Sequence, residues 1–189
     1  KLPNTLEYVT YTDYNQVADA IRTLVVRGAP AIGISGAFGL ALAVLQSNAI
    51  EKKELIDYLE KAKNILFETR PTAVNLVWGL EKIMQVANQA STVQEIKTNV
   101  VETAKKMAEE DIKINMTMGK IGSELLDNND TIMTHCNAGA LATAGYGTAL
   151  GVIRATKDSG KNIKVIATET RPVQQGSRLT AFELQHDEI

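Results

Sequence analysis

Apolar residues recur every three or four positions through most of residues 13–126, and this spacing predicts a largely helical first part. Thr12 or Asp13 is expected to cap the first helix, while Pro30 and Pro71 are expected to begin later helices, where a missing N–H does no harm. Residues 2–11 alternate β-branched and aromatic side chains, which favours a strand or hairpin arm. The predicted helices span residues 13–26, 30–45, 52–67, 71–84 and 92–126, the last with a bend near Gly119 or Gly122.

A polar segment at residues 127–130 separates this part from a second pattern of short apolar runs and helical segments. The runs predict a strand at 131–135, a helix at 138–156, a strand at 164–168 and a helix at 177–185. Such alternation is typical of a parallel sheet built by right-handed crossovers. The expected fold class is therefore α/β, with a mostly helical N-terminal domain (residues 1–129) followed by a Rossmann-like parallel-sheet domain (130–189). Because two parallel strands are not a stable sheet, we expect this second domain to be truncated at its C-terminal side.

Cys136 is the only cysteine, and it follows the first predicted strand directly. The Ala- and Gly-rich segment after it is predicted to be helical, so Cys136 is expected in a tight strand-to-helix turn, where α/β proteins often carry their chemistry. A helix N-terminus at that point would stabilise a bound anion or a thiolate. The alternative is a buried structural cysteine, which the position alone favours equally.

Three arginines precede predicted helix starts. Arg70 and Arg171 lie in identical Glu-Thr-Arg-Pro tetrapeptides, and Arg27 precedes Gly28, which permits a left-handed turn. An arginine beside free helix N–H groups suits a phosphate, so convergence of two or three of them would bind a phosphorylated metabolite. For any single arginine, pairing with a neighbouring glutamate is the favoured alternative.

Composition narrows the class of protein further. The net charge of -2 gives no sign of a nucleic-acid surface. A single cysteine excludes an internal disulfide framework, and without an N-terminal signal a cytoplasmic location is expected. The uncharged runs at residues 28–50 and 137–153 favour tightly packed helices over membrane spans. Two histidines and one thiol are too few for a metal site, and the glycines at 145, 147 and 151 lack the spacing of a dinucleotide-binding fingerprint.

Four segments resemble the methylthioribose-1-phosphate isomerase family, and the resemblance covers essentially the whole chain. The wider family includes ribose-1,5-bisphosphate isomerase and the regulatory subunits of the exchange factor for translation initiation factor 2. The segments are Val26-Arg27-Gly28-Ala29-Pro30-Ala31-Ile32-Gly33, Thr69-Arg70-Pro71-Thr72-Ala73-Val74-Asn75-Leu76, Thr134-His135-Cys136-Asn137-Ala138-Gly139 and Glu169-Thr170-Arg171-Pro172 continuing to Ala181.

The resemblance implies an aldose–ketose isomerase of methionine salvage, converting 5-methylthioribose 1-phosphate to 5-methylthioribulose 1-phosphate without a metal or an organic cofactor. It implies that Cys136 is catalytic, alongside an aspartate expected beyond Ile189, so residues 1–189 alone are expected to be inactive. Gln174 stands where leucine is usual, which leaves open whether Gln174 or Gln175 faces the substrate. The implied substrate-binding residues are Arg27, Gly28, Ala29, Arg70 and Gln175.

The implied reaction needs ring opening by an acid before, or as, hydrogen moves from C2 to C1 of the sugar. Cys136 suits either proton transfer as a thiolate or stabilisation of a hydride transfer, and the sequence does not choose between them. A sugar phosphate is the expected partner, with a homodimer implied by the resemblance and no nucleic acid or membrane. The alternatives are a ribose-1,5-bisphosphate isomerase, with a basic rather than an apolar pocket at C5, and a regulatory subunit without enzymatic activity.

Overall fold

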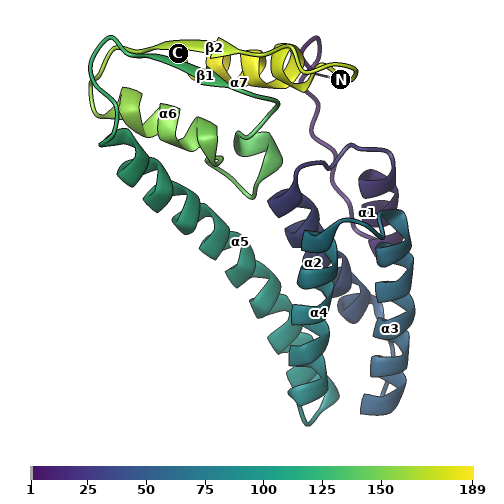
Figure 1. The fold of residues 1–189 in the computed structure, drawn as a ribbon. Helices are drawn as coiled ribbons and strands as arrows, with labels where there is room; N and C mark the ends of the chain where they lie inside the picture. The colour runs from purple at the N-terminus through teal and green to yellow at the C-terminus, as the bar shows by residue number, and fades with distance from the viewer. Residues whose placement is uncertain (1) are drawn as a thin grey trace. The chain divides into compact units, whose positions relative to one another are not determined.

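The computed structural model describes residues 2–189, which divide into two compact units. Thr10–Glu109 form one unit, and residues 2–9 with Glu110–Ile189 form the other. The division falls inside helix α5 (Val93–Ser123), which contributes to both units (Figure 1). The boundary expected near residue 129 as a limit between folding domains stays a prediction.

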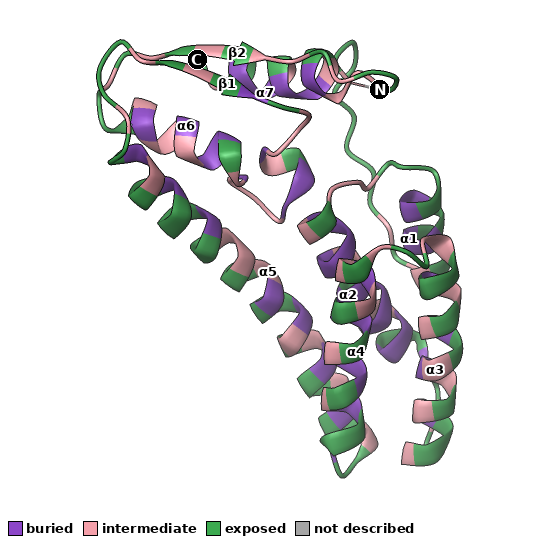
Figure 2. Cartoon of the chain, viewed as in Figure 1, coloured by how far each residue is buried: buried purple, intermediate pink, exposed green. Residues whose placement is uncertain are grey.

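Helices alone build the unit Thr10–Glu109, as the apolar spacing predicts. Helix α2 packs against α1, α3 and α4, and the buried faces of the helices meet in one core that includes Ile21, Leu40, Leu59 and Ile83 (Figure 2). Besides α5, the helices are α1 (Tyr14–Arg22), α2 (Ala29–Gln46), α3 (Lys52–Thr69) and α4 (Val74–Gln89). The predicted spans of α2 and α3 are confirmed to within two residues.

Helix α1 begins where the sequence predicts and ends four residues early. Asp13 is its N-cap, because the Asp13 carboxylate accepts the N–H of Asn15 and the Gln16 side chain accepts the N–H of Asp13. The helix stops at Arg22 rather than Val26, since Leu24 adopts a left-handed backbone with φ 62°. Gly28 has φ 98° directly before α2, which confirms the predicted left-handed turn.

Pro71 does not begin α4, contrary to the prediction. The N–H of Ala73 donates to the carbonyl of Arg70 at 3.0 Å, so residues 70–73 form a turn and the helix starts at Val74. Proline is favoured at the second position of such a turn for the same reason that it is favoured at a helix start, its fixed φ. Residues 2–11 likewise form no strand, and most of them are exposed.

Two parallel strands, β1 (Thr131–Thr134) and β2 (Lys164–Ala167), lie in the other unit, with Thr131 opposite Lys164. This confirms the predicted parallel pairing. A small core of Leu150, Ile153 and Leu184 packs with apolar side chains of the sheet. The remaining elements are the 3-10 turn η1 (Ala140–Ala142), helix α6 (Ala149–Asp158), the π-helical turn η2 (Gly176–Thr180) and helix α7 (Ala181–His186).

The helix predicted at residues 138–156 is wrong in its first half. Residues 138–148 form an irregular loop that contains η1, and α6 begins only at Ala149. Tyr146 and Gly147 have φ 72° and 86°, which no right-handed helix contains. The bend expected in α5 near Gly119 or Gly122 stays a prediction. Helix α5 is continuous through Gly119, where a Cβ would lie 2.7 Å from the carbonyl oxygen of Gly151 in α6.

Helix α2 is long and apolar enough to cross a membrane by length and composition. More than half of that helix is nevertheless buried against the other helices of its unit. This burial agrees with the tightly packed helix that the sequence favours over a membrane span.

Candidate functional site

Cys136 lies two residues beyond the end of β1, in the loop rather than at a helix N-terminus as predicted. Its backbone is left-handed, with φ 62°, and its side chain is half-buried. Residues other than glycine, asparagine and aspartate rarely adopt this conformation, which is often found at functional sites. The prediction fails because distant carboxylates accept N–H groups of the following residues, whose hydrogen bonds to one another form turns and not an α-helix.

Two threonine hydroxyls bind the backbone of Cys136. The N–H of Cys136 donates to Thr170 Oγ1 at 3.0 Å, and Thr180 Oγ1 donates to the carbonyl of Cys136 at 2.6 Å. Thr170 follows β2, and Thr180 is the last residue of η2. The loop that carries the thiol is therefore tied to two segments that follow the second strand.

The residues after β2 bring Gln175 to the same end of the sheet. A Cβ on Gly176 would overlap the carbonyl oxygen of Thr168, so η2 starts in direct contact with the end of β2. Thr168 Oγ1 in turn lies 2.8 Å from Nδ1 of His135, the residue before Cys136. Cys136 and Gln175 thus belong to one group of loops at the carboxyl ends of both strands, where parallel sheets place their ligands.

The two glutamines differ in their contacts. Gln174 has φ 56°, and its amide donates to Glu169 Oε1 at 3.1 Å. The side chain of Gln175 makes no hydrogen bond to any of residues 2–189 and is half-buried. An unpaired amide beside the thiol loop favours Gln175 as the ligand-binding member of the pair.

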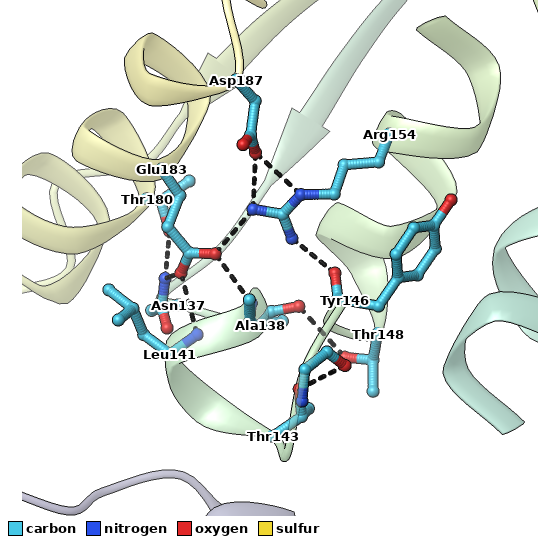
Figure 3. Close-up of polar contacts among 12 residues, drawn as sticks. Asn137, Ala138, Leu141, Thr143, Tyr146, Thr148, Arg154, Thr180, Glu183 and Asp187 are labelled. Carbon is cyan, nitrogen blue, oxygen red and sulfur yellow. Dashed lines mark hydrogen bonds and ion pairs between the residues drawn. The ribbon is translucent and has the colours of Figure 1, made fainter. Parts of the chain in front are cut away.

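Glu183, which the sequence analysis missed, organises the loop that follows Cys136 (Figure 3). Its carboxylate is 4% exposed and accepts the N–H of Ala140 at 2.7 Å and the side-chain amide of Asn137 at 2.8 Å. Gly139 leaves room for this carboxylate, since a Cβ there would overlap both of its oxygens. Glu183 therefore replaces the helical hydrogen bonds that the segment was predicted to make.

Arg154 balances the charge of Glu183. Its guanidinium donates to Glu183 Oε2 at 2.8 Å and to Asp187 Oδ2 at 2.7 Å, and also to the carbonyl of Tyr146 (Figure 3). Burial alone would lower the pKa of Arg154, but the hydrogen bonds to Glu183 and Asp187 outweigh it and raise the pKa. No Lys, Arg, Asp or Glu stands between Asp130 and Arg154 in the sequence. A single charged residue in such an uncharged segment needs a partner when it is buried, and this was the signal in the sequence.

Asp111 on α5 holds the other side of the loop. Its carboxylate accepts the N–H of Ala144 at 2.8 Å and the side-chain amide of Asn115 at 3.1 Å. Two carboxylates from distant helices thus bind the backbone between β1 and α6.

Of the three arginines predicted to bind phosphate, Arg27 and Arg70 lie in the helical unit, and the exposed Arg171 lies in the other unit. Residues 171–174 form a turn, so no helix begins at Pro172 as predicted. Nη2 of Arg27 is buried and has no hydrogen-bond partner within residues 2–189. Arg70 caps the C-terminus of α3, and within the same residues neither it nor Arg27 forms an ion pair with a glutamate. The alternative of simple glutamate pairing is therefore not observed, and both guanidinium groups remain available for an anion.

Backbone contact between α2 and α4 relates these arginines to each other. A Cβ on Gly33 would lie 2.5 Å from the carbonyl oxygen of Asn75, and one on Gly79 would overlap the carbonyl oxygen of Gly33. Gly33 lies four residues, or about 6 Å of helix, after the start of α2, and Asn75 is the second residue of α4. The helix starts that follow Arg27 and Arg70 are therefore neighbours, as the convergence hypothesis requires.

Gly79→Ala is expected to lower the free energy of unfolding by about 1–3 kcal/mol, although alanine is the better helix former. The added methyl group meets backbone atoms of Gly33, which cannot rotate away. Gly36→Ala is the matched control, because its Cβ would clash with a side-chain end, Leu76 Cδ1 at 2.6 Å, and not with backbone, while its contacts with Leu80 would be ordinary ones. Urea unfolding of both variants measures the difference, and equal stabilities would show that the helices tolerate a wider separation.

No group of three or more His, Cys, Asp or Glu side chains within residues 2–189 has the arrangement of a metal site. The chemistry available at the strand ends is therefore that of a thiol, threonine hydroxyls, a histidine and an amide.

A helical unit followed by a parallel strand–loop–helix unit, with a thiol at the strand ends, defines a protein of the α/β class. Residues 25–189 match the Initiation factor 2 subunit family, and the chain belongs to that family. A methylthioribose-1-phosphate isomerase of Acetivibrio thermocellus is 51% identical over 100% of this chain and 56% of its own length. The chain thus spans little more than half the length of such relatives.

Solved structures show the same likeness. The crystal structure of 5-methylthioribose 1-phosphate isomerase from Pyrococcus horikoshii OT3 superposes with a TM-score of 0.95 and 43% identity, covering 100% of this chain and 53% of that one. A crystal structure described as translation initiation factor eIF-2B, subunit delta, from A. fulgidus superposes with a TM-score of 0.93 and 48% identity, covering 100% of this chain and 56% of that one. The mostly helical fold with a small parallel sheet is thereby confirmed.

Proposed function

We propose that the protein is an aldose–ketose isomerase that converts 5-methylthioribose 1-phosphate to 5-methylthioribulose 1-phosphate in methionine salvage. The observation that carries the proposal is the fixed, left-handed backbone of Cys136 at the carboxyl ends of two parallel strands. The isomerase name of relatives that are about half identical to this chain supports the same activity. A purely structural cysteine needs neither a strained backbone nor two dedicated hydroxyl partners.

In this proposal Cys136 acts on the C1 and C2 carbons of the opened sugar. The candidate substrate ligands are Arg27, Gly28, Ala29, Arg70 and Gln175, of which Arg27 and Arg70 suit the phosphate. Gly28 is the N-cap of α2 and Ala29 its first residue, and the free N–H groups of the first turn offer further donors to an anion. Turnover in D₂O separates the two chemical routes, because a transferred proton exchanges with solvent and a hydride does not.

The test is turnover by the intact natural protein, with 5-methylthioribose 1-phosphate and ribose 1,5-bisphosphate as separate substrates. We expect kcat/KM for the methylthio sugar to exceed that for the bisphosphate by at least about 100-fold, since one pocket cannot suit both an apolar group and a second phosphate. A preference for the bisphosphate would assign the other isomerase activity. Turnover of neither sugar would contradict an enzymatic function.

The competing function is that of a regulatory subunit without enzymatic activity. It is favoured by the initiation-factor name of one structure that is 48% identical to this chain. Such a subunit needs no reactive thiol, so alkylation of Cys136 would leave its partner binding unchanged. Loss of sugar turnover on alkylation is the result that the isomerase proposal expects.

We further propose a cytoplasmic homodimer that acts on a small sugar phosphate without nucleic acid or membrane. The net charge of -2 supports the absence of a nucleic-acid partner. Exposed apolar side chains on α5, among them Ile114 and Ile121, are available for association between subunits. Sedimentation equilibrium of the intact protein at micromolar concentration would give twice the subunit mass.

A further inference from the structure

We propose that Thr170 and Thr180 are positioning residues that hold Cys136 in its left-handed conformation and so fix the direction of the Cα–Cβ bond that carries its thiol. The proposal rests on the proposed function, because it assigns Cys136 to the reaction. It adds two residues whose role would be exerted through the backbone of Cys136 and not through contact with the substrate.

The backbone of Cys136 requires such support. With φ 62° it occupies a region that L-residues with a full side chain populate rarely, and such a residue persists only where its surroundings over-determine it. Thr170 accepts the hydrogen bond on one side of the Cys136 Cα, and Thr180 donates on the other. The peptide plane of the N–H turns about φ, and the peptide plane of the carbonyl turns about ψ. Hydrogen bonds to both groups therefore fix both torsion angles, and with them the direction of the Cα–Cβ bond.

The hydrogen-bond directions agree at both hydroxyls. Thr170 Oγ1 accepts from Cys136 and can donate to the carbonyl of Thr168 at 3.2 Å. Thr180 Oγ1 donates to Cys136 and accepts from the side-chain amide of Asn137 at 3.3 Å. Thr170 Oγ1 also lies 3.2 Å from Thr168 Oγ1. Each hydroxyl thus has at least one donor and one acceptor besides its own O–H, and each is oriented by a partner other than Cys136.

Both threonines are themselves held in place. Thr170 has φ 62°, the same left-handed conformation as Cys136, and lies directly after Glu169 in the loop that follows β2. Thr180 is 0% exposed and joins η2 to α7. The π-helical turn shifts the residues that follow it relative to an α-helix, and such turns are often found at functional sites. We infer that η2 directs the Thr180 hydroxyl at the thiol loop.

The test compares valine and serine at both positions in the intact natural protein. Valine keeps the shape of threonine and removes the hydroxyl, whereas serine keeps the hydroxyl and removes a methyl group. For Thr170→Val and Thr180→Val we expect kcat to fall about 10- to 100-fold while KM changes by less than about threefold. For Thr170→Ser and Thr180→Ser we expect kcat within about threefold of the natural enzyme.

Retention of kcat in the valine variants would overturn the proposal. Serine variants as slow as the valine variants would also overturn it, since the loss would then follow from packing and not from the hydroxyl. Should the completely buried Thr180→Val site prevent folding, Thr170→Val, in the more accessible loop, decides the question alone.

A second readout separates this proposal from the proposed function. The rate at which iodoacetamide alkylates Cys136, followed by mass spectrometry of its peptide, is expected to change at least about threefold in the valine variants and to return in the serine variants. An unchanged rate overturns the positioning role whether or not the protein turns over a sugar. Failure of the natural protein to turn over either sugar, with the expected alkylation rates, would overturn the isomerase function alone.

Discussion

Cys136→Ser is expected to lower kcat for 5-methylthioribose 1-phosphate by about 10²- to 10⁴-fold, the contribution of a positioned proton-transferring group. Serine is nearly the same size and retains the backbone hydrogen bonds to Thr170 and Thr180. The serine hydroxyl ionises far less readily than a thiol, so the variant should lose the reactive group and keep the fold. KM should change little, because the substitution leaves the proposed phosphate ligands Arg27 and Arg70 unaltered. Steady-state kinetics of the intact natural protein measure both constants.

Two controls make the serine result interpretable. Met133→Leu alters the 69% exposed Met133 of β1, which makes no polar contact with the thiol loop, and should leave kcat and KM unchanged. Thermal unfolding should show equal stability for the natural protein and the serine variant. A serine variant that retains kcat within about tenfold would show that Cys136 is not the group that moves hydrogen.

Elements whose signals are local could be predicted from the sequence. The strands at 131–134 and 164–167 follow from short apolar runs between polar segments, and α2 and α3 follow from helical spacing. The loop at 138–148 could not be predicted, because its alanines favour a helix and its actual partners are Asp111 and Glu183, which are distant in sequence. Composition describes what a segment prefers alone, whereas these carboxylates bind its N–H groups after the chain has folded.

The residues of the candidate site also fall into those with a local signal in the sequence and those without one. Cys136, Arg27 and Arg70 stand out as candidates in the sequence because they lie beside glycine, proline or a strand end. Thr170 and Thr180 are common residues whose hydroxyls matter only through their contact with the Cys136 backbone. No pattern of spacing marks them, so they required the structure.

Glu183 precedes Leu184 of the small core and, of the two carboxylates that bind the loop after Cys136, is the one that binds the residues nearest the thiol. The carboxylate has an arginine on one side and backbone N–H groups on the other, with Asn137 completing its shell. Because Asn137 directly follows Cys136, a shift of Glu183 would reach the thiol through a single residue. Stability and catalysis therefore depend on the same side chain in the proposed enzyme.

Glu183→Ala is expected to lower the free energy of unfolding by about 3–5 kcal/mol, the usual result of removing one partner from a buried ion pair. The change would leave the N–H of Ala140 without an acceptor and would deprive the half-buried Arg154 of one of its two carboxylates. Asp187→Ala is the matched control. Asp187 binds the same guanidinium, but its side chain is 27% exposed. Water can therefore solvate Arg154 in its place, and the free energy of unfolding should fall by only about 1 kcal/mol.

Glu183→Gln separates the two functions of the carboxylate. Its amide oxygen can still accept the N–H of Ala140, while the charge that balances Arg154 is lost. We expect a stability between those of the natural protein and the alanine variant, with urea unfolding of the three variants at pH 7 as the measurement. Equal effects of Glu183→Ala and Asp187→Ala would mean that the loop is held mainly by Asp111 and its own packing. A larger loss of stability in Asp187→Ala than in Glu183→Ala would place the essential contact of Arg154 at the C-terminal end of α7, where Asp187 caps the helix.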